Sequence, residues 1–210
     1  MDRTSVSGTE DLGSNPGGST KILFCIKSLS VSISHGEWSF LTSGLKGFRR
    51  KVYIGVMSKL EVGNPAPKFK LEDQKGEIVR LSDFIGRKVL VFFYPKADTP
   101  GCTVQSCSVS EFLGELTELA AVPIGISPDS PEDQLKFDEK FSLGFPLLAD
   151  RNHAVAEAYG VWGEKSMYGK SYLGIIRSSF IIDEKGTVFS VWYNVSPKDT
   201  VPKALAALGG

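Results

Sequence analysis

Val89-Leu90-Val91-Phe92-Phe93-Tyr94 is a continuous apolar run, rich in β-branched and aromatic residues. Such a run is typical of a central strand that is buried on both faces. Pro95 and then Pro100-Gly101 end this strand and form a loop. Apolar residues from Val109 to Ala120 follow helical spacing, which predicts a helix beginning near Cys102. The loop therefore delivers Cys102 to the N-terminus of a helix.

The segments on both sides of this run alternate between predicted strands and helices. Turn residues at 73–76 and 183–186 join short apolar runs and predict two hairpins, 69–71 with 78–81 and 179–182 with 188–192. Further strands are predicted at 122–126 and 145–148. Helices are predicted from Ser130, over 154–159, and after Thr200 as a capping residue. This order predicts an α/β fold with a mixed central β-sheet flanked by helices.

Composition and charge exclude several classes of function. The chain has 24 basic and 24 acidic residues, so its formal net charge of zero gives no reason to expect nucleic acid or an anionic membrane as a partner. Nowhere do 18 apolar residues run together, as a transmembrane helix requires. The loop after Tyr94 lacks a glycine-rich phosphate fingerprint, so a dinucleotide or P-loop site is not expected there.

The composition of the chain changes near residue 57. Residues 1–56 contain ten serines and a basic cluster, Arg49-Arg50-Lys51, and their apolar patch at 22–33 fits neither a strand nor a helix period, so we expect this segment to be disordered. They read either as a plastid or mitochondrial transit segment or as a leader that precedes the true start at Met57. We expect the second, with a cytoplasmic protein, and a plastid location under the first. Residues 57–210 are expected to form the one working domain.

Cys102 has the surroundings of a reactive thiol. A helix N-terminus offers free backbone N–H groups and a partial positive charge, both of which favour thiolate over thiol. The hydroxyl of Thr99, three residues earlier, can reach the same pocket and hydrogen-bond to sulfur or to a bound oxygen. The prolines stiffen the loop and help to exclude water.

The spacing of Cys102 and Cys107 constrains a disulfide between them. In a regular helix their Cα atoms would lie about 8.6 Å apart. Disulfides require Cα separations below roughly 7 Å. A bond between these thiols therefore requires residues 100–110 to unwind.

The pattern Pro95…Thr99…Cys102 resembles the active-site motif Pro-x-x-x-Thr-x-x-Cys of the peroxiredoxins. A second cysteine five residues later, at Cys107, is similar to the subgroup called bacterioferritin comigratory protein in bacteria and peroxiredoxin Q in plants. The stretches 159–165 and 174–180 also resemble this subgroup, and the similarity extends from about Lys59 to Leu208.

The resemblance implies a thioredoxin-like fold and an antioxidant thiol peroxidase that reduces hydrogen peroxide and organic hydroperoxides. Cys102 would be the peroxidatic cysteine, oxidised to sulfenic acid, and Cys107 the resolving cysteine that closes a Cys102–Cys107 disulfide. Arg177 would stabilise the thiolate and orient the peroxide, Pro95 would shield the thiolate, and Thr99 belongs to the same motif. Thioredoxin or a similar dithiol protein would reduce the disulfide. The expected enzyme is a monomer without metal or organic cofactor.

Other interpretations of the cysteines are weaker or stay open. A zinc site needs four ligands, and His153 is the only further candidate in residues 57–210, where we expect it at the surface. A thioredoxin-type oxidoreductase would need Cys-x-x-Cys. Glu164-Lys165 is expected in a solvated loop. A peroxide sensor or redox relay would use the same cysteine pair, and repeated turnover of peroxide distinguishes the enzyme from it.

Overall fold

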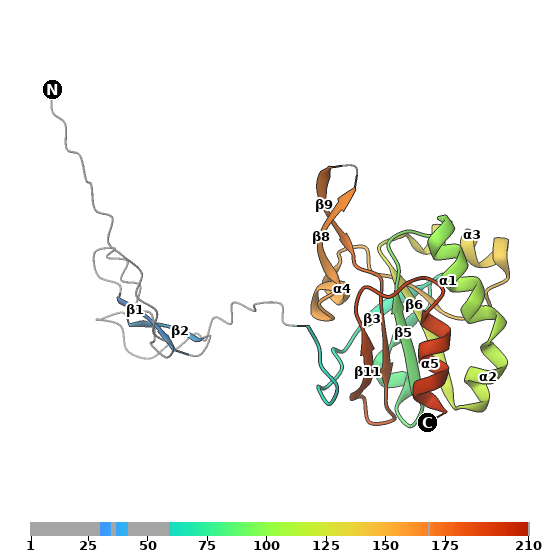
Figure 1. The fold of residues 1–210 in the computed structure, drawn as a ribbon, viewed down its shortest axis with the longest axis horizontal. Helices are drawn as coiled ribbons and strands as arrows, with labels where there is room; N and C mark the ends of the chain where they lie inside the picture. Colours follow the sequence, from blue (N-terminus) through green and yellow to red (C-terminus); the bar gives the residue numbers. More distant parts are fainter. Residues whose placement is uncertain (1–29, 35–36, 42–58, 168, 210) are drawn as a thin grey trace. The chain divides into compact units, whose positions relative to one another are not determined.

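The computed structural model describes residues 30–34, 37–41, 59–167 and 169–209 (Figure 1). The chain divides into two units, residues 1–56 and 57–210, each of which is described by itself. In the first unit, β1 (Ser30–Ser34) pairs antiparallel with β2 (Glu37–Leu41). A strand pair was not expected in this segment, and the expectation of a disordered leader for the rest of residues 1–56 lies outside the described residues.

The second unit is built on a seven-stranded mixed sheet, in the order β11-β10-β5-β6-β7-β3-β4. The three central strands run parallel to one another, β5 (Lys88–Phe93), β6 (Ala121–Ser127) and β7 (Leu147–Ala149). The outer strands join them antiparallel, β10 (Ser178–Ile182) and β11 (Val188–Trp192) on one side, β3 (Lys70–Asp73) and β4 (Ile78–Arg80) on the other. The predicted mixed central sheet is confirmed.

Helices cover both faces of this sheet (Figure 1). One face carries α1 (Pro100–Glu111), α2 (Leu113–Glu118), α3 (Pro131–Phe141) and α5 (Thr200–Leu208), and the other carries α4 (Ala154–Ala158). A 3-10 turn, η1 (Leu81–Phe84), follows β4. Alternate residues of β5 serve the two faces, because Leu90 and Phe92 pack with Cys102 while Val91 and Phe93 pack with Tyr159. No helix in the described ranges is long and apolar enough to cross a membrane.

Two helix boundaries differ from those predicted. The helix expected to continue to Ala120 breaks at Phe112, whose φ of −101° and ψ of 18° end α1 and begin α2. At the last helix, Asp199 is the N-cap and Thr200 is the first helical residue, with its side chain buried. The predicted cap at Ser130 is confirmed, since its hydroxyl accepts a hydrogen bond from the Asp133 N–H at 3.2 Å.

A hairpin that the sequence did not predict lies between α4 and β10. Its strands are β8 (Trp162–Met167) and β9 (Lys170–Ile175), and it extends beyond the end of the sheet (Figure 1). Glu164 and Lys165 lie in β8, so placing them in a loop was wrong. His153 is the N-cap of α4 and is half-buried, so the expected surface position holds only in part, and its ring stacks on Trp162 with centroids 3.8 Å apart.

Candidate active site

The junction between β5 and α1 places Cys102 at the carboxyl edge of the parallel strands. Thr99 is the N-cap of α1, with extended backbone, and Pro100 is the first helical residue, where its missing N–H costs nothing. Cys102 follows in the first turn, and its side chain has no exposed surface. The predicted helix N-terminus at this cysteine is confirmed.

Arg177 reaches Cys102 from the short connection between β9 and β10. Its Nη2 donates a hydrogen bond to the Cys102 Sγ at 3.3 Å. A Cβ atom on Gly101 would lie 3.3 Å from the same Nη2, so a glycine at this position lets the guanidinium approach the start of α1. The structure thus brings together a buried thiol, a helix N-terminus and a fixed cation.

The guanidinium of Arg177 is held by a buried polar chain behind it. Its Nη1 donates to the Oε1 of Gln105, which lies on α1 one turn after Cys102. The Gln105 Nε2 in turn donates to the Thr200 Oγ1 at 2.8 Å, and this hydroxyl lies 3.4 Å from the Ser179 Oγ. Because these side chains come from α1, β10 and α5, three elements of the fold together determine where Arg177 points.

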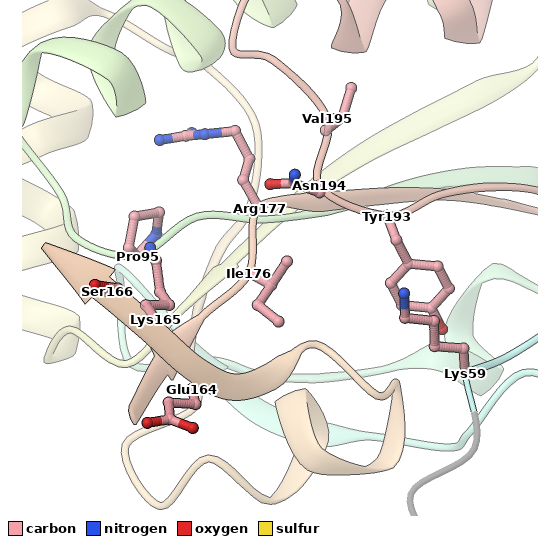
Figure 2. Close-up of a pocket in the computed structure, with 10 residues that line it drawn as sticks. All are labelled: Lys59, Pro95, Glu164, Lys165, Ser166, Ile176, Arg177, Tyr193, Asn194 and Val195. Atoms are coloured by element: carbon pink, nitrogen blue, oxygen red, sulfur yellow. The ribbon is translucent and has the colours of Figure 1, made fainter. Parts of the chain in front are cut away.

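A cleft of about 530 Å³ opens on the solvent side of Arg177 (Figure 2). Arg177 and Pro95 lie on one side, Tyr193 and Lys59 on the other, and Ile176 lies between them. The remaining lining residues are Glu164, Lys165, Ser166, Asn194 and Val195. Cys102 is not among them, because its side chain is fully buried, and it is linked to the cleft through its hydrogen bond from Arg177.

Lys165 is a second cation of this cleft. Its ammonium donates a hydrogen bond to the Ile175 carbonyl at 3.0 Å. Burial lowers the pKa of Lys165, the positive charge of Arg177 lowers it further, and the negative charge available at Cys102 opposes this shift. Two cations, Arg177 and Lys165, therefore line the cleft close to the thiol.

Cys107 lies further along the same helix and is half-buried. Both thiols are free, and α1 runs unbroken from Pro100 to Glu111 through both of them. Burial raises the pKa of the Cys107 thiol, so this thiol stays protonated at neutral pH in the reduced fold. The intact helix holds the two cysteines in the geometry that does not permit a disulfide.

Comparison with known proteins identifies the family. The model of the AhpC/TSA family matches residues 62–191, a range that contains the cleft's Arg177 and both thiols. The chain belongs to this family. Among curated relatives, a putative peroxiredoxin Bcp of Haemophilus influenzae is 51% identical over 143 residues, which are 68% of this chain and 92% of the relative. Peroxiredoxin Bcp of Escherichia coli is 52% identical over 136 residues, 65% of this chain and 87% of the relative.

Solved structures point to the same group of peroxiredoxins. Peroxiredoxin Q of Xanthomonas campestris matches with a TM-score of 0.64 and 35% identity, over 67% of this chain and 89% of that one. Peroxidoxin BcpB of Mycobacterium tuberculosis matches with a TM-score of 0.65 and 36% identity, over 71% and 97% of the two chains. The resemblance to the Bcp and peroxiredoxin Q group and the thioredoxin-like fold are confirmed. The protein is a thiol peroxidase, an oxidoreductase with an antioxidant function.

In the structure of this peroxiredoxin, the other four predicted site residues do not all contact the Cys102 thiol. Arg177 contacts Cys102, and Pro95 is half-buried and lines the same cleft as Arg177. The Thr99 hydroxyl donates to the Lys96 carbonyl at 3.0 Å, so in this state it is directed to its own loop. The role of Thr99, like the separate roles of the two cysteines, stays a prediction.

Gln105 is a site residue of this peroxiredoxin that sequence reasoning missed. Its position three residues after Cys102, on the same face of a predicted helix, was a usable signal.

The described residues were also expected to lack a zinc site. Among the residues that the structure describes, no group of three or more His, Cys, Asp and Glu side chains could hold an ion.

Proposed function

We propose that Cys102 is the nucleophile of this peroxidase and that Arg177 activates it. The observation that supports this most directly is the hydrogen bond from the Arg177 Nη2 to the Cys102 Sγ at 3.3 Å. A guanidinium is always charged, so it favours the thiolate at any physiological pH. The first turn of α1 adds free N–H groups and a partial positive charge on the same side.

In the first step, the Cys102 thiolate attacks the terminal oxygen of a hydroperoxide. The O–O bond breaks, the sulfur is oxidised to sulfenic acid, and the other oxygen leaves as water or an alcohol after taking up a proton. Arg177 stabilises the negative charge that develops on this leaving oxygen. A protein of related structure, the bacterioferritin comigratory protein of Xanthomonas campestris, is described as having alkyl peroxide reduction activity. Hydrogen peroxide and organic hydroperoxides are therefore the proposed substrates.

In the second step, Cys107 attacks the sulfenic acid of Cys102. A disulfide forms and water leaves. Both thiols lie on one helix, so the bond is intramolecular and needs no second subunit, which supports a monomeric enzyme. A dithiol protein such as thioredoxin then reduces the disulfide by exchange.

Oxidation should unwind α1. Amides of residues 101–111 are expected to exchange with deuterium much faster after one equivalent of peroxide, because the intact helix keeps the two sulfurs apart. Hydrogen exchange with mass spectrometry measures this, and the intact mass should remain that of one chain. Cys107→Ser is the matched control, since it is oxidised but cannot close the bond and should keep slow exchange. Equal exchange in reduced and oxidised wild-type protein would contradict the mechanism.

The working enzyme is proposed to be residues 57–210, with residues 1–56 outside it. In support, the family model begins at residue 62, and the Haemophilus influenzae relative is covered over 92% of its own length by 68% of this chain. We place this activity in the cytoplasm, with a plastid as the alternative if residues 1–56 are a transit segment. Fractionation of cells distinguishes the two.

Turnover by the full chain and by a chain starting at Met57 should be the same. In an assay coupled to thioredoxin and its reductase, both should consume many equivalents of peroxide per enzyme. A single equivalent would instead support a redox relay. Activity in the full chain alone would show that residues 1–56 contribute to the enzyme.

A further inference from the structure

The loop between β5 and α1, residues 95–99, is tied to the rest of the domain at two places. The backbone N–H of Ala97 donates a hydrogen bond to the Asp129 Oδ2 at 2.7 Å. The ammonium of Lys140 contacts the Asp98 carboxylate at 2.7 Å. Because this loop leads directly into the first turn of α1, its position determines where the Cys102 sulfur lies.

The tie through Asp129 rests on a buried network whose donors and acceptors are determined. Burial raises the pKa of Tyr94, so its hydroxyl remains a donor, and it donates to the Gln134 Oε1. The Gln134 Nε2 must then donate, and it does so to the Ser127 Oγ at 2.9 Å and to the Leu148 carbonyl at 3.0 Å. The Ser127 Oγ also accepts from the Asp129 N–H at 3.2 Å, so both of its acceptor positions are used, and it donates its own proton to the Asp129 Oδ2 at 2.7 Å.

This network belongs to elements that the proposed unwinding of α1 does not involve. Ser127 ends β6, Gln134 lies on α3 and Leu148 lies on β7, and the side chains of Ser127 and Gln134 have no exposed surface. The Asp129 oxygen is therefore held at a defined point against the sheet. β5 and β6 are parallel neighbours, so the residues that follow their carboxyl ends meet at one edge.

The second contact, between Lys140 and Asp98, is more exposed to solvent than the contact with Asp129. The side chains of Lys140 and Asp98 are 56% and 49% exposed, so water and salt screen their attraction. The Ala97 N–H, by contrast, makes its hydrogen bond at a residue that is only 8% exposed. The contact with Asp129 is the more rigid of the two.

We propose that Asp129 is a positioning residue for the reaction of Cys102 with peroxide. It holds the N–H of Ala97, and through this loop it keeps Pro95 and the first turn of α1 in register with Arg177. The inference rests on the proposed role of Cys102. The contact needs an oxygen acceptor at this point and does not need a negative charge.

Two substitutions of Asp129 test this in single-turnover experiments on the full chain. Asp129→Ala is expected to slow oxidation of Cys102 by hydrogen peroxide about tenfold, since small misplacements of a reacting atom are costly. Asp129→Asn keeps an acceptor oxygen and should stay within about twofold of wild type. The later closure of the disulfide, followed by rapid quenching and mass spectrometry, should keep its rate in both variants. Lys140→Met, which removes the other tie of the same loop, is the matched control and should also stay within about twofold.

Several outcomes would overturn the proposal. They are an unchanged rate in Asp129→Ala, an equal loss in Asp129→Asn, or a slowing of both steps together with a lower melting temperature, which would indicate a structural role only. If the alanine variant does not fold, Asp129→Glu serves instead, because it displaces the acceptor by one methylene and should also slow the first step. Failure of the proposed function is distinguishable, because then wild-type Cys102 itself would not be oxidised.

Discussion

Cys102→Ser is expected to reduce peroxide consumption to the rate measured without enzyme. A serine hydroxyl at this position is not ionised by the Arg177 guanidinium or by the start of α1, so the nucleophile is lost while its shape is kept. The rate of peroxide loss in the thioredoxin-coupled assay measures this. The fold should survive, because sulfur and oxygen are similar in size and the pocket already supplies a hydrogen-bond donor.

Cys107→Ser is the control that separates the two cysteines. This variant should still react with one equivalent of peroxide and then stop at the sulfenic acid, which a dimedone adduct on Cys102 detects by mass. If Cys102→Ser retained turnover while Cys107→Ser lost its first reaction, the roles would be reversed. If both variants retained turnover, neither thiol would be the reacting group.

Arg177→Met is expected to lower the second-order rate constant for hydrogen peroxide by about 10²- to 10³-fold, the usual cost of removing a group that stabilises charge in a transition state. Methionine fills a similar volume but cannot donate to the Cys102 Sγ or to Gln105. Arg177→Lys should recover only part of the rate, because an ammonium lacks the planar fork that makes both contacts at once. Stopped-flow measurement of the reduced protein gives these constants directly.

An arginine at the opposite end of β5 provides the comparison for Arg177. Arg87 is exposed and precedes the first residue of this strand, whereas Cys102 follows its carboxyl end. Arg87→Met removes the same charge from the chain without touching the cleft and should leave the rate constant unchanged. Equal rates in Arg177→Met and wild type would show that the 3.3 Å contact with sulfur does not contribute to the reaction.

The parts of the fold that could be predicted are those that bury most apolar surface. β5 was recognisable because a strand covered on both faces has apolar side chains at every position, which few other structures require. The break at Phe112 was not recognisable, because Phe112 packs against the core as a helical residue would, while only its backbone leaves the helix. The spacing of apolar side chains indicates which face of a helix is buried, but it does not indicate where a change in the backbone ψ angle ends the helix.

The hairpin of β8 and β9 left little signal for a similar reason. It extends away from the sheet and pairs mainly with itself, so its strands need no alternating apolar pattern (Figure 1). Gly163, Gly169 and Gly174 further obscure the strand propensity. Three residues reach the cleft from it, Glu164, Lys165 and Ser166, and the first two therefore looked like parts of an exposed loop.

The site itself could be predicted only where its chemistry lies close together in the sequence. Cys102 and Cys107 can be recognised from their spacing, and Arg177 from the resemblance to a known family. Asp129 carries no motif of its own, and its link to Ala97 spans 32 positions of the chain. It was accessible through the rule that the carboxyl ends of neighbouring parallel strands converge, since it follows β6 as Ala97 follows β5.

A sulfur with no exposed surface is out of reach of another protein. While α1 is wound, a protein thiol cannot approach Cys102, because its sulfur is fully buried and contacts the Arg177 guanidinium. Once the helix opens, both sulfurs become available for exchange. We therefore expect the reducing protein to bind the oxidised enzyme in preference to the reduced one. In a cell that contains much reduced enzyme, the reducing protein would then remain free.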